Sequence, residues 1–251
     1  MPVDLNCDMG ESFGRYTLGQ DAAILPHVTS ANIACGFHAG DPGVMAETVR
    51  LAAAAGVGIG AHPGYPDLQG FGRRNMDIAP EEVVALMTYQ LGALAGFARV
   101  AGVPLTHVKP HGALYNQAAG DPRLARAVAQ AVSGFSRELI LVGLAGSALI
   151  AAGVEIGLRV ANEGFPDRAY NSDGTLRSRR EPGAVLESPE AVAANAVRLA
   201  TEGVSFANRG VPVETLCLHG DNQGALEFAL KVRQALTAQG VKVLAMGEFL
   251  P

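Results

Sequence analysis

Residues of the types that carry out chemistry follow six short apolar runs in this 251-residue chain. The segments are NCDMGE at 6–11, GFHAGD at 36–41, AHPGYPD at 61–67, HVKPHG at 107–112, NEGFPDR at 162–168 and HGDN at 219–222. A lone histidine beside an apolar run is more often a hydrogen-bonded structural residue than a catalytic one. Four such runs present histidine, however, and this recurrence indicates a shared functional site.

Four carboxylates in these segments have no evident structural duty. Asp41 precedes a proline and fits a helix cap, whereas Asp8, Glu11, Glu163 and Asp221 have no comparable local role. With nearby histidines they could bind a divalent cation through mixed oxygen and nitrogen ligands, or act as general acid and base. The residue types leave both alternatives open.

Lys109 is one of only three lysines, and it lies between a β-branched residue and Pro-His-Gly. Burial of its charge would be costly without a partner. That partner is either a carboxylate such as Asp8 or Glu163, or the carboxylate or phosphate of a substrate. Arg73, beside glycines, and Arg168, in a long charged loop, are either solvated or help to hold an anionic ligand or a partner subunit.

Several classes of protein are excluded or disfavoured. The sequence contains no GxSxG, GxxxxGK[ST] or HExxH motif. Nineteen Lys and Arg residues against 24 Asp and Glu give a formal charge of −5, and no basic block suggests a nucleic-acid partner. The cysteines form no CxxC pair or even framework, which is typical of buried thiols in a reducing compartment. Cys7 is a minor candidate for a nucleophile.

The N-terminus has no basic region followed by an apolar one, and no uninterrupted apolar run reaches the roughly 18 residues of a membrane span. We therefore expect a cytoplasmic protein without a membrane partner. Charged residues make up only 17% of the chain, which predicts a folded protein, and we expect residues 1–251 to form a single β/α-barrel domain.

Apolar runs alternate with alanine-rich segments of helical period, which predicts a parallel α/β sheet. Strands are expected at 3–7, 30–36, 57–61, 104–108, 138–143, 157–161 and 213–218, with 241–245 as a candidate eighth. Helices are expected at 42–55, 80–101, 122–134, 188–202 and 223–239, and a long irregular stretch at 162–187. The first strand lacks a following GxGxxG, which favours a closed barrel with its site at the carboxyl ends of the strands.

Six longer segments together resemble the LamB/YcsF family, whose members act as the A subunit of 5-oxoprolinase. They are VDLNCDMGESFG, SANIACGFHAGDP, GAHPGYPDLQGFGRR, THVKPHGALYN, EGFPDRAYNSDGTL and LCLHGDN, and the resemblance covers residues 3–248 in order. It implies a distorted TIM-like (β/α) barrel with seven strands. It also implies ATP-dependent opening of 5-oxo-L-proline to L-glutamate, together with subunits B and C.

With this resemblance, the site residues take expected roles. The expected catalytic residues are Asp8, Glu11, His38, His62, Lys109 and Glu163. The expected substrate-binding residues are Asn6, His111, Arg73, Arg168, His219 and Asp221. ATP is the expected cofactor, with its site left open between this chain and a partner; a divalent metal ion is a candidate, with Asp8, His62 and His219 as potential ligands.

Two other functions stay open. One is a metal-dependent deacetylase or carbohydrate hydrolase on a related barrel, which predicts a tightly bound ion and activity of this chain alone. The other is a non-catalytic subunit that binds 5-oxoproline without converting it.

Overall fold

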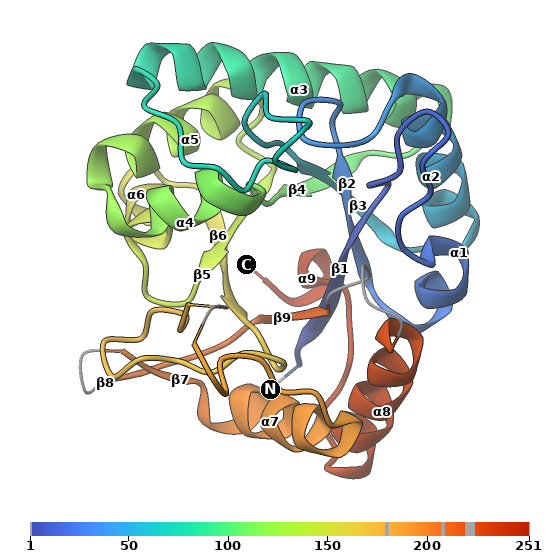
Figure 1. Ribbon diagram of the computed structural model, residues 1–251, viewed down its shortest axis with the longest axis vertical. Helices are drawn as coiled ribbons and strands as arrows, with labels where there is room; N and C mark the ends of the chain where they lie inside the picture. Colours follow the sequence, from blue (N-terminus) through green and yellow to red (C-terminus); the bar gives the residue numbers. More distant parts are fainter. Residues whose placement is uncertain (1, 179–180, 207–208, 219–223, 251) are drawn as a thin grey trace.

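A computed structural model describes residues 2–178, 181–206, 209–218 and 224–250. Seven parallel strands close into a barrel in the order β1-β2-β3-β4-β5-β6-β9, and helices surround them (Figure 1). The strands are β1 (Asp4–Met9), β2 (Ser30–Ala34), β3 (Gly58–His62), β4 (Leu105–Val108), β5 (Ile140–Leu144), β6 (Arg159–Gly164) and β9 (Thr215–Leu218). All seven predicted strands are confirmed, as is the distorted TIM-like barrel.

The predicted eighth strand at 241–245 is wrong. Val243 forms only an isolated parallel bridge with Val3. The chain then turns into α9 (Met246–Phe249), whose Met246 packs against Ile140 and Val142 of β5. A short helix therefore covers the end of the barrel where an extra strand was expected.

The five predicted helices are present, and further elements were missed. The helices are α1 (Asp21–Ile24), the 3-10 turn η1 (Leu25–His27), α2 (Pro42–Ala54), α3 (Pro80–Val100), α4 (Gly112–Gly120), α5 (Pro122–Phe135), α6 (Ala148–Glu155), α7 (Pro189–Glu202), α8 (Ala225–Ala238) and α9. An antiparallel pair, β7 (Val204–Phe206) and β8 (Arg209–Val211), lies outside the barrel. The missed α4 and α6 are short, and α4 begins at a glycine, so neither shows a long apolar period.

Local capping explains where the main helices begin. The side chain of Asp41 accepts hydrogen bonds from the first-turn amides of α2, and Asp121 does the same for α5. Ser188 caps α7. In each case proline occupies the first turn, where a backbone N–H would have no partner within the helix, so its absence costs no hydrogen bond.

One helix among the described residues, α3, is long and apolar enough to cross a membrane by length and composition alone. The core helix of a soluble protein passes the same test, and Val83, Met87, Leu91 and Leu94 of α3 are fully buried in the main core. The helix is therefore weak evidence for a membrane span.

The two faces of the barrel strands differ in chemistry. Outward-facing residues such as Leu5, Cys7 and Met9 of β1 join the apolar core beneath the helices. Alternate residues such as Asn6 and Asn32 are also fully buried, but they hydrogen-bond to one another inside the barrel. The barrel interior beside β1 and β2 is therefore a polar network rather than layers of branched aliphatic residues.

Asp4 lies at the amino-terminal end of this network. Its carboxylate accepts hydrogen bonds from Thr29, Ser30 and Thr215 at 2.5–2.7 Å, and one from the backbone N–H of Met246. Burial nevertheless raises the pKa of Asp4 to about 6, because the desolvation of a carboxylate outweighs these bonds. Asp4 thus links β1, β2, β9 and α9, and its pKa is raised.

The raised pKa predicts that protonated Asp4 stabilises the fold below pH 4 and that this contribution is lost as the pH rises through about 6. The difference corresponds to about 3 kcal/mol. The neutral amide of the Asp4→Asn variant does not titrate. The unfolding free energy of this variant, relative to that of the wild type, should therefore rise by about that amount between pH 4 and pH 7. Urea unfolding across this range measures the difference; a pH-independent difference would refute the assignment.

Candidate functional site

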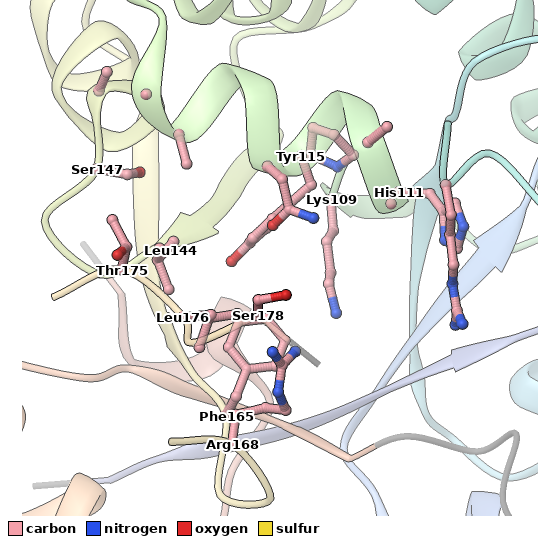
Figure 2. A pocket seen from close by; sticks show the side chains of 18 of the residues that line it. Lys109, His111, Tyr115, Leu144, Ser147, Phe165, Arg168, Thr175, Leu176 and Ser178 are labelled. Carbon is pink, nitrogen blue, oxygen red and sulfur yellow. The ribbon is translucent and has the colours of Figure 1, made fainter. Parts of the chain in front are cut away.

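A cavity of about 780 Å³ opens at the carboxyl ends of the barrel strands. Its walls come from the segment after β4, from α4 and from residues 173–178 of the long loop after β6. Figure 2 shows the amino group of Lys109 pointing into this space, with Phe165, Arg168 and Ser178 facing it from the other side. The cavity therefore lies where a β/α barrel places its functional residues.

The ammonium of Lys109 is held between two carboxylates. Its Nζ lies 2.9 Å from Oδ1 of Asp8 and 2.8 Å from Oε1 of Glu163, and it also donates to Oδ1 of Asn6 at 3.2 Å. Burial lowers the pKa of Lys109, but the neighbouring negative charges, with Asp8 foremost, raise it well above its usual value. Lys109 is thus a permanently charged residue whose charge the protein itself balances.

A chain of side-chain hydrogen bonds holds Asp8 from beneath. Nε2 of His107 donates to Oδ1 of Asn32 at 2.8 Å, and Nδ2 of Asn32 donates to Oδ1 of Asp8 at 2.8 Å. The same Nδ2 also donates to Asn6 at 2.7 Å. Gly60 makes room for the imidazole, because a Cβ at that position would clash with the ring of His107. His107 is therefore an inward-facing residue beneath Asp8 and Lys109.

Glu163 is fully buried and satisfied by protein donors. Asn6 and Lys109 bind its Oε1, at 3.0 and 2.8 Å, and the hydroxyl of Tyr115 donates to Oε2 at 2.7 Å. Burial and the Glu163 charge raise the pKa of Tyr115 well above its usual value, so the hydroxyl keeps its proton. Glu163 therefore balances Lys109 from beneath the cavity rather than facing a ligand.

Glu11, His38, His62 and His111 form a second cluster beside Asp8. One potential ligand atom from each lies within 4.8 Å of all the others, so this group could hold a metal ion. The rings of His38 and His111 stack at 3.7 Å between centroids. Burial lowers the pKa of His38 well below its usual value and that of His111 to about 3, so both rings are neutral at pH 7.

The arginines near the cavity have different roles. Arg73 lines it, with its guanidinium carbon 5.0 Å from the centroid of the Phe71 ring. Arg168 also lines it and is largely buried, donating to the carbonyl groups of Ala184 and Arg177. Arg74, next to Arg73, instead pairs with Asp67. Arg73 and Arg168 therefore both lie at the wall of the cavity.

The structure places the predicted site residues in three groups. Lining the cavity are Asp8, His62, Lys109, His111, Arg73 and Arg168. Glu11 and His38 adjoin the wall through the histidine cluster, whereas Asn6 and Glu163 lie beneath Lys109. His219 and Asp221 lie outside the described residues, and so does the part of the metal prediction that rests on His219.

Cys7, the minor candidate for a nucleophile, packs into the outer core, and burial raises the pKa of its thiol well above the usual value. Tyr115, Asn32 and Cys217, whose Sγ lies 3.1 Å from Nζ of Lys109, were not predicted as site residues. Asn32 could have been found, because its alternation with Ser30 predicts an inward polar side chain. Tyr115 could not, because it lies on the unpredicted α4.

Comparison with known proteins identifies the family. The model of the LamB/YcsF family matches residues 3–250. The chain belongs to the LamB/YcsF family. A protein of Methylococcus capsulatus, named as the A subunit of 5-oxoprolinase, is 56% identical to this LamB/YcsF chain over 252 residues, covering 99% of this chain and 97% of the relative.

Solved structures agree with the fold. The lactam utilization protein from Thermus thermophilus has a TM-score of 0.90 and 50% identity, with 98% of this LamB/YcsF chain and 100% of that chain covered. The Bc1960 peptidoglycan N-acetylglucosamine deacetylase has a TM-score of 0.51 at 15% identity, covering 99% and 87% of the two chains. The second likeness concerns the fold alone.

The charge balance at Lys109 generates a stability prediction. Lys109→Met would leave the carboxylates of Asp8 and Glu163 facing each other without a cation, which should lower the unfolding free energy by about 3–5 kcal/mol at pH 7. The matched control is Lys231→Met, which removes an exposed ion pair with Glu190 and should have a far smaller effect. Urea denaturation compares the two; equal losses would contradict the proposed balance.

Proposed function

We propose that this chain is the A subunit of an ATP-dependent 5-oxoprolinase, which opens 5-oxo-L-proline to L-glutamate together with subunits B and C. The observation that carries the proposal is the 56% identity, over almost the full length of both chains, to a relative with that name. The name of the Thermus protein refers to the same chemical class, a lactam. We place the reaction in the cytoplasm, where the buried free cysteines would stay reduced.

The proposed reaction requires activation of a stable amide. Transfer of the terminal phosphoryl group of ATP to the lactam oxygen would make the ring carbon a better electrophile. Water then adds to that carbon, the C–N bond breaks and the nitrogen takes up a proton, which leaves an acyl phosphate of glutamate. A second water hydrolyses this acyl phosphate to L-glutamate and phosphate. ATP is the proposed co-substrate, and a divalent metal ion is a further proposed cofactor.

Asp8 is well placed to act on the water. Lys109 and Asn32 hold its Oδ1, while its Oδ2 lies 3.3 Å from Nε2 of His62. It also lines the cavity, unlike the fully buried Glu163. We therefore assign Asp8 the role of general base, oriented by Lys109, and keep Glu163 as the counter-charge that positions Lys109.

Arg73 and Arg168 are candidates for binding the substrate carboxylate. Both line the cavity, and a guanidinium can bind a carboxylate through two parallel hydrogen bonds. We assign recognition of the substrate carboxylate to these two residues.

One observation favours a second candidate. The cluster of Glu11 with three histidines is a nitrogen-rich set of donors beside a cavity, an arrangement that also suits a metal-dependent hydrolase. Such an enzyme would convert its substrate without ATP and without partner subunits. The dependence on ATP and on partners therefore separates the two candidates.

We expect glutamate to form from 5-oxoproline and ATP only when this chain is combined with subunits B and C. Asp8→Asn in the assembled enzyme should lower kcat by about 10²–10⁴-fold, because the amide cannot accept a proton from water. Glu155→Gln, which alters an exposed pair with Arg126, is the matched control and should leave kcat unchanged. Glutamate release and phosphate release are measured together.

Each other outcome contradicts part of the proposal. Turnover by the chain alone without ATP would favour the metal-dependent hydrolase. Full activity of Asp8→Asn would contradict its role as base. If the chain binds 5-oxoproline but the assembled mixture, with each subunit folded, forms no glutamate, the catalytic proposal fails and a binding subunit is favoured.

A further inference from the structure

Four strand ends deliver the cluster of Glu11, His38, His62 and His111 to one point beside the cavity. Glu11 follows β1, His38 follows β2, His62 ends β3 and His111 follows β4. His62 and His111 line the cavity, and all three imidazoles are buried. The closed barrel, rather than the local sequence, thus brings these side chains together.

The hydrogen bonds of two rings decide which nitrogens face the cluster. Nδ1 of His62 lies 2.7 Å from the carbonyl oxygen of Lys109, and Nε2 of His111 lies 2.8 Å from that of Phe71. A carbonyl oxygen only accepts, so each of these nitrogens carries the ring proton. Nε2 of His62 and Nδ1 of His111 are therefore the ring nitrogens that face the cluster.

These two nitrogens lie only 3.0 Å apart. A cation beside them could accept a lone pair from each ring. The outward N–H groups bound to carbonyl oxygens are also the arrangement that orients histidine ligands of metal ions.

His38 supplies an independent observation. Its side chain is fully buried, and neither ring nitrogen has a hydrogen-bond partner. A buried polar group without a partner is costly, and its presence in a site calls for a ligand. Nε2 of His38 lies 3.5 Å from Oε1 of Glu11, so this ring is aimed at the same point.

The spacing of the ligand atoms fits a small ion. Oε1 of Glu11 lies 3.5 Å from both Nε2 of His38 and Nδ1 of His111, and His62 lies 3.0 Å from His111. Ligands bonded at about 2.0–2.1 Å in a tetrahedron are separated by about 3.3–3.4 Å. These three separations are close to that value, and all four ligand atoms lie within 4.8 Å of one another.

We propose that Glu11, His38, His62 and His111 bind one divalent transition-metal ion of the Zn²⁺, Co²⁺ or Ni²⁺ type. Three imidazoles and one carboxylate favour these ions over Mg²⁺ and Ca²⁺, which prefer oxygen ligands. The ligand set keeps His62 from the sequence prediction and adds Glu11, His38 and His111. His219, another predicted ligand, lies outside the described residues. The inference goes beyond the proposed function, because it concerns this cluster whatever reaction the chain performs.

The proposed ion would lie at the wall of the cavity. Oδ2 of Asp8 is 3.3 Å from Nε2 of His62, so this carboxylate lies next to the ligands without belonging to the four-residue cluster. A molecule in the cavity could therefore contact both Asp8 and the ion. This position couples the metal site to the network that Lys109 organises.

The test uses the full chain after dialysis against a chelator. Titration with Co²⁺ should give the visible absorption of a four-coordinate nitrogen-and-oxygen site, saturating at one ion per chain, and Zn²⁺ should displace it while excess Mg²⁺ should not. His38→Ala and the isosteric Glu11→Gln should each weaken Co²⁺ binding by at least about 100-fold. His27→Asn, on η1 and outside the cluster, is the matched control and should bind as wild type does.

Absence of Co²⁺ and Zn²⁺ binding by the folded wild-type chain would overturn the inference, as would unchanged binding in the folded Glu11→Gln variant. Circular dichroism verifies folding, and the wild-type titration remains decisive if a variant does not fold. Because this readout needs neither ATP nor the partner subunits, a positive result stands even if the lactam reaction fails. A negative result would remove the metal ion from the 5-oxoprolinase proposal but would leave the ATP-dependent lactam reaction untouched.

Discussion

A buried positive charge organises the functional end of this barrel. The ammonium of Lys109 lies between the carboxylates of Asp8 and Glu163, and its burial away from water makes each of these contacts strong. Removal of water from three charges is favourable only when they are mutually paired and their other atoms are hydrogen-bonded. Asn6 and Tyr115 meet that requirement from β1 and α4.

Lys109 also joins the two halves of the site through its backbone. Its carbonyl oxygen accepts the proton of Nδ1 of His62, which directs the other ring nitrogen toward His111 and Asp8. The same residue therefore sets the position of a carboxylate with its side chain and the orientation of an imidazole with its main chain. A change in the course of β4 would disturb both groups together.

The polar interior explains why this barrel can hold such a site. Small barrels are usually filled by branched apolar side chains, whereas Asn6, Asn32 and His107 form a hydrogen-bonded chain here beneath Asp8. Each polar group in that chain has a partner, so the interior loses little stability and gains directional control. At the opposite end, Met246 of α9 closes the barrel with an apolar contact.

The sequence by itself determined the seven strands and five main helices, because alternation, apolar period and capping residues such as Asp41 and Asp121 are local signals. It also brought Asp8, His62 and Lys109 to one end of the barrel, since parallel strands share that edge. Only the tertiary structure decided that Glu163 is a buried counter-charge, that 241–245 forms no strand, and that Glu11 meets three histidines. The physical reason is that pairing, burial and side-chain direction depend on residues more than a hundred positions apart, such as Lys109 and Asp8, whose distance only the closed barrel sets.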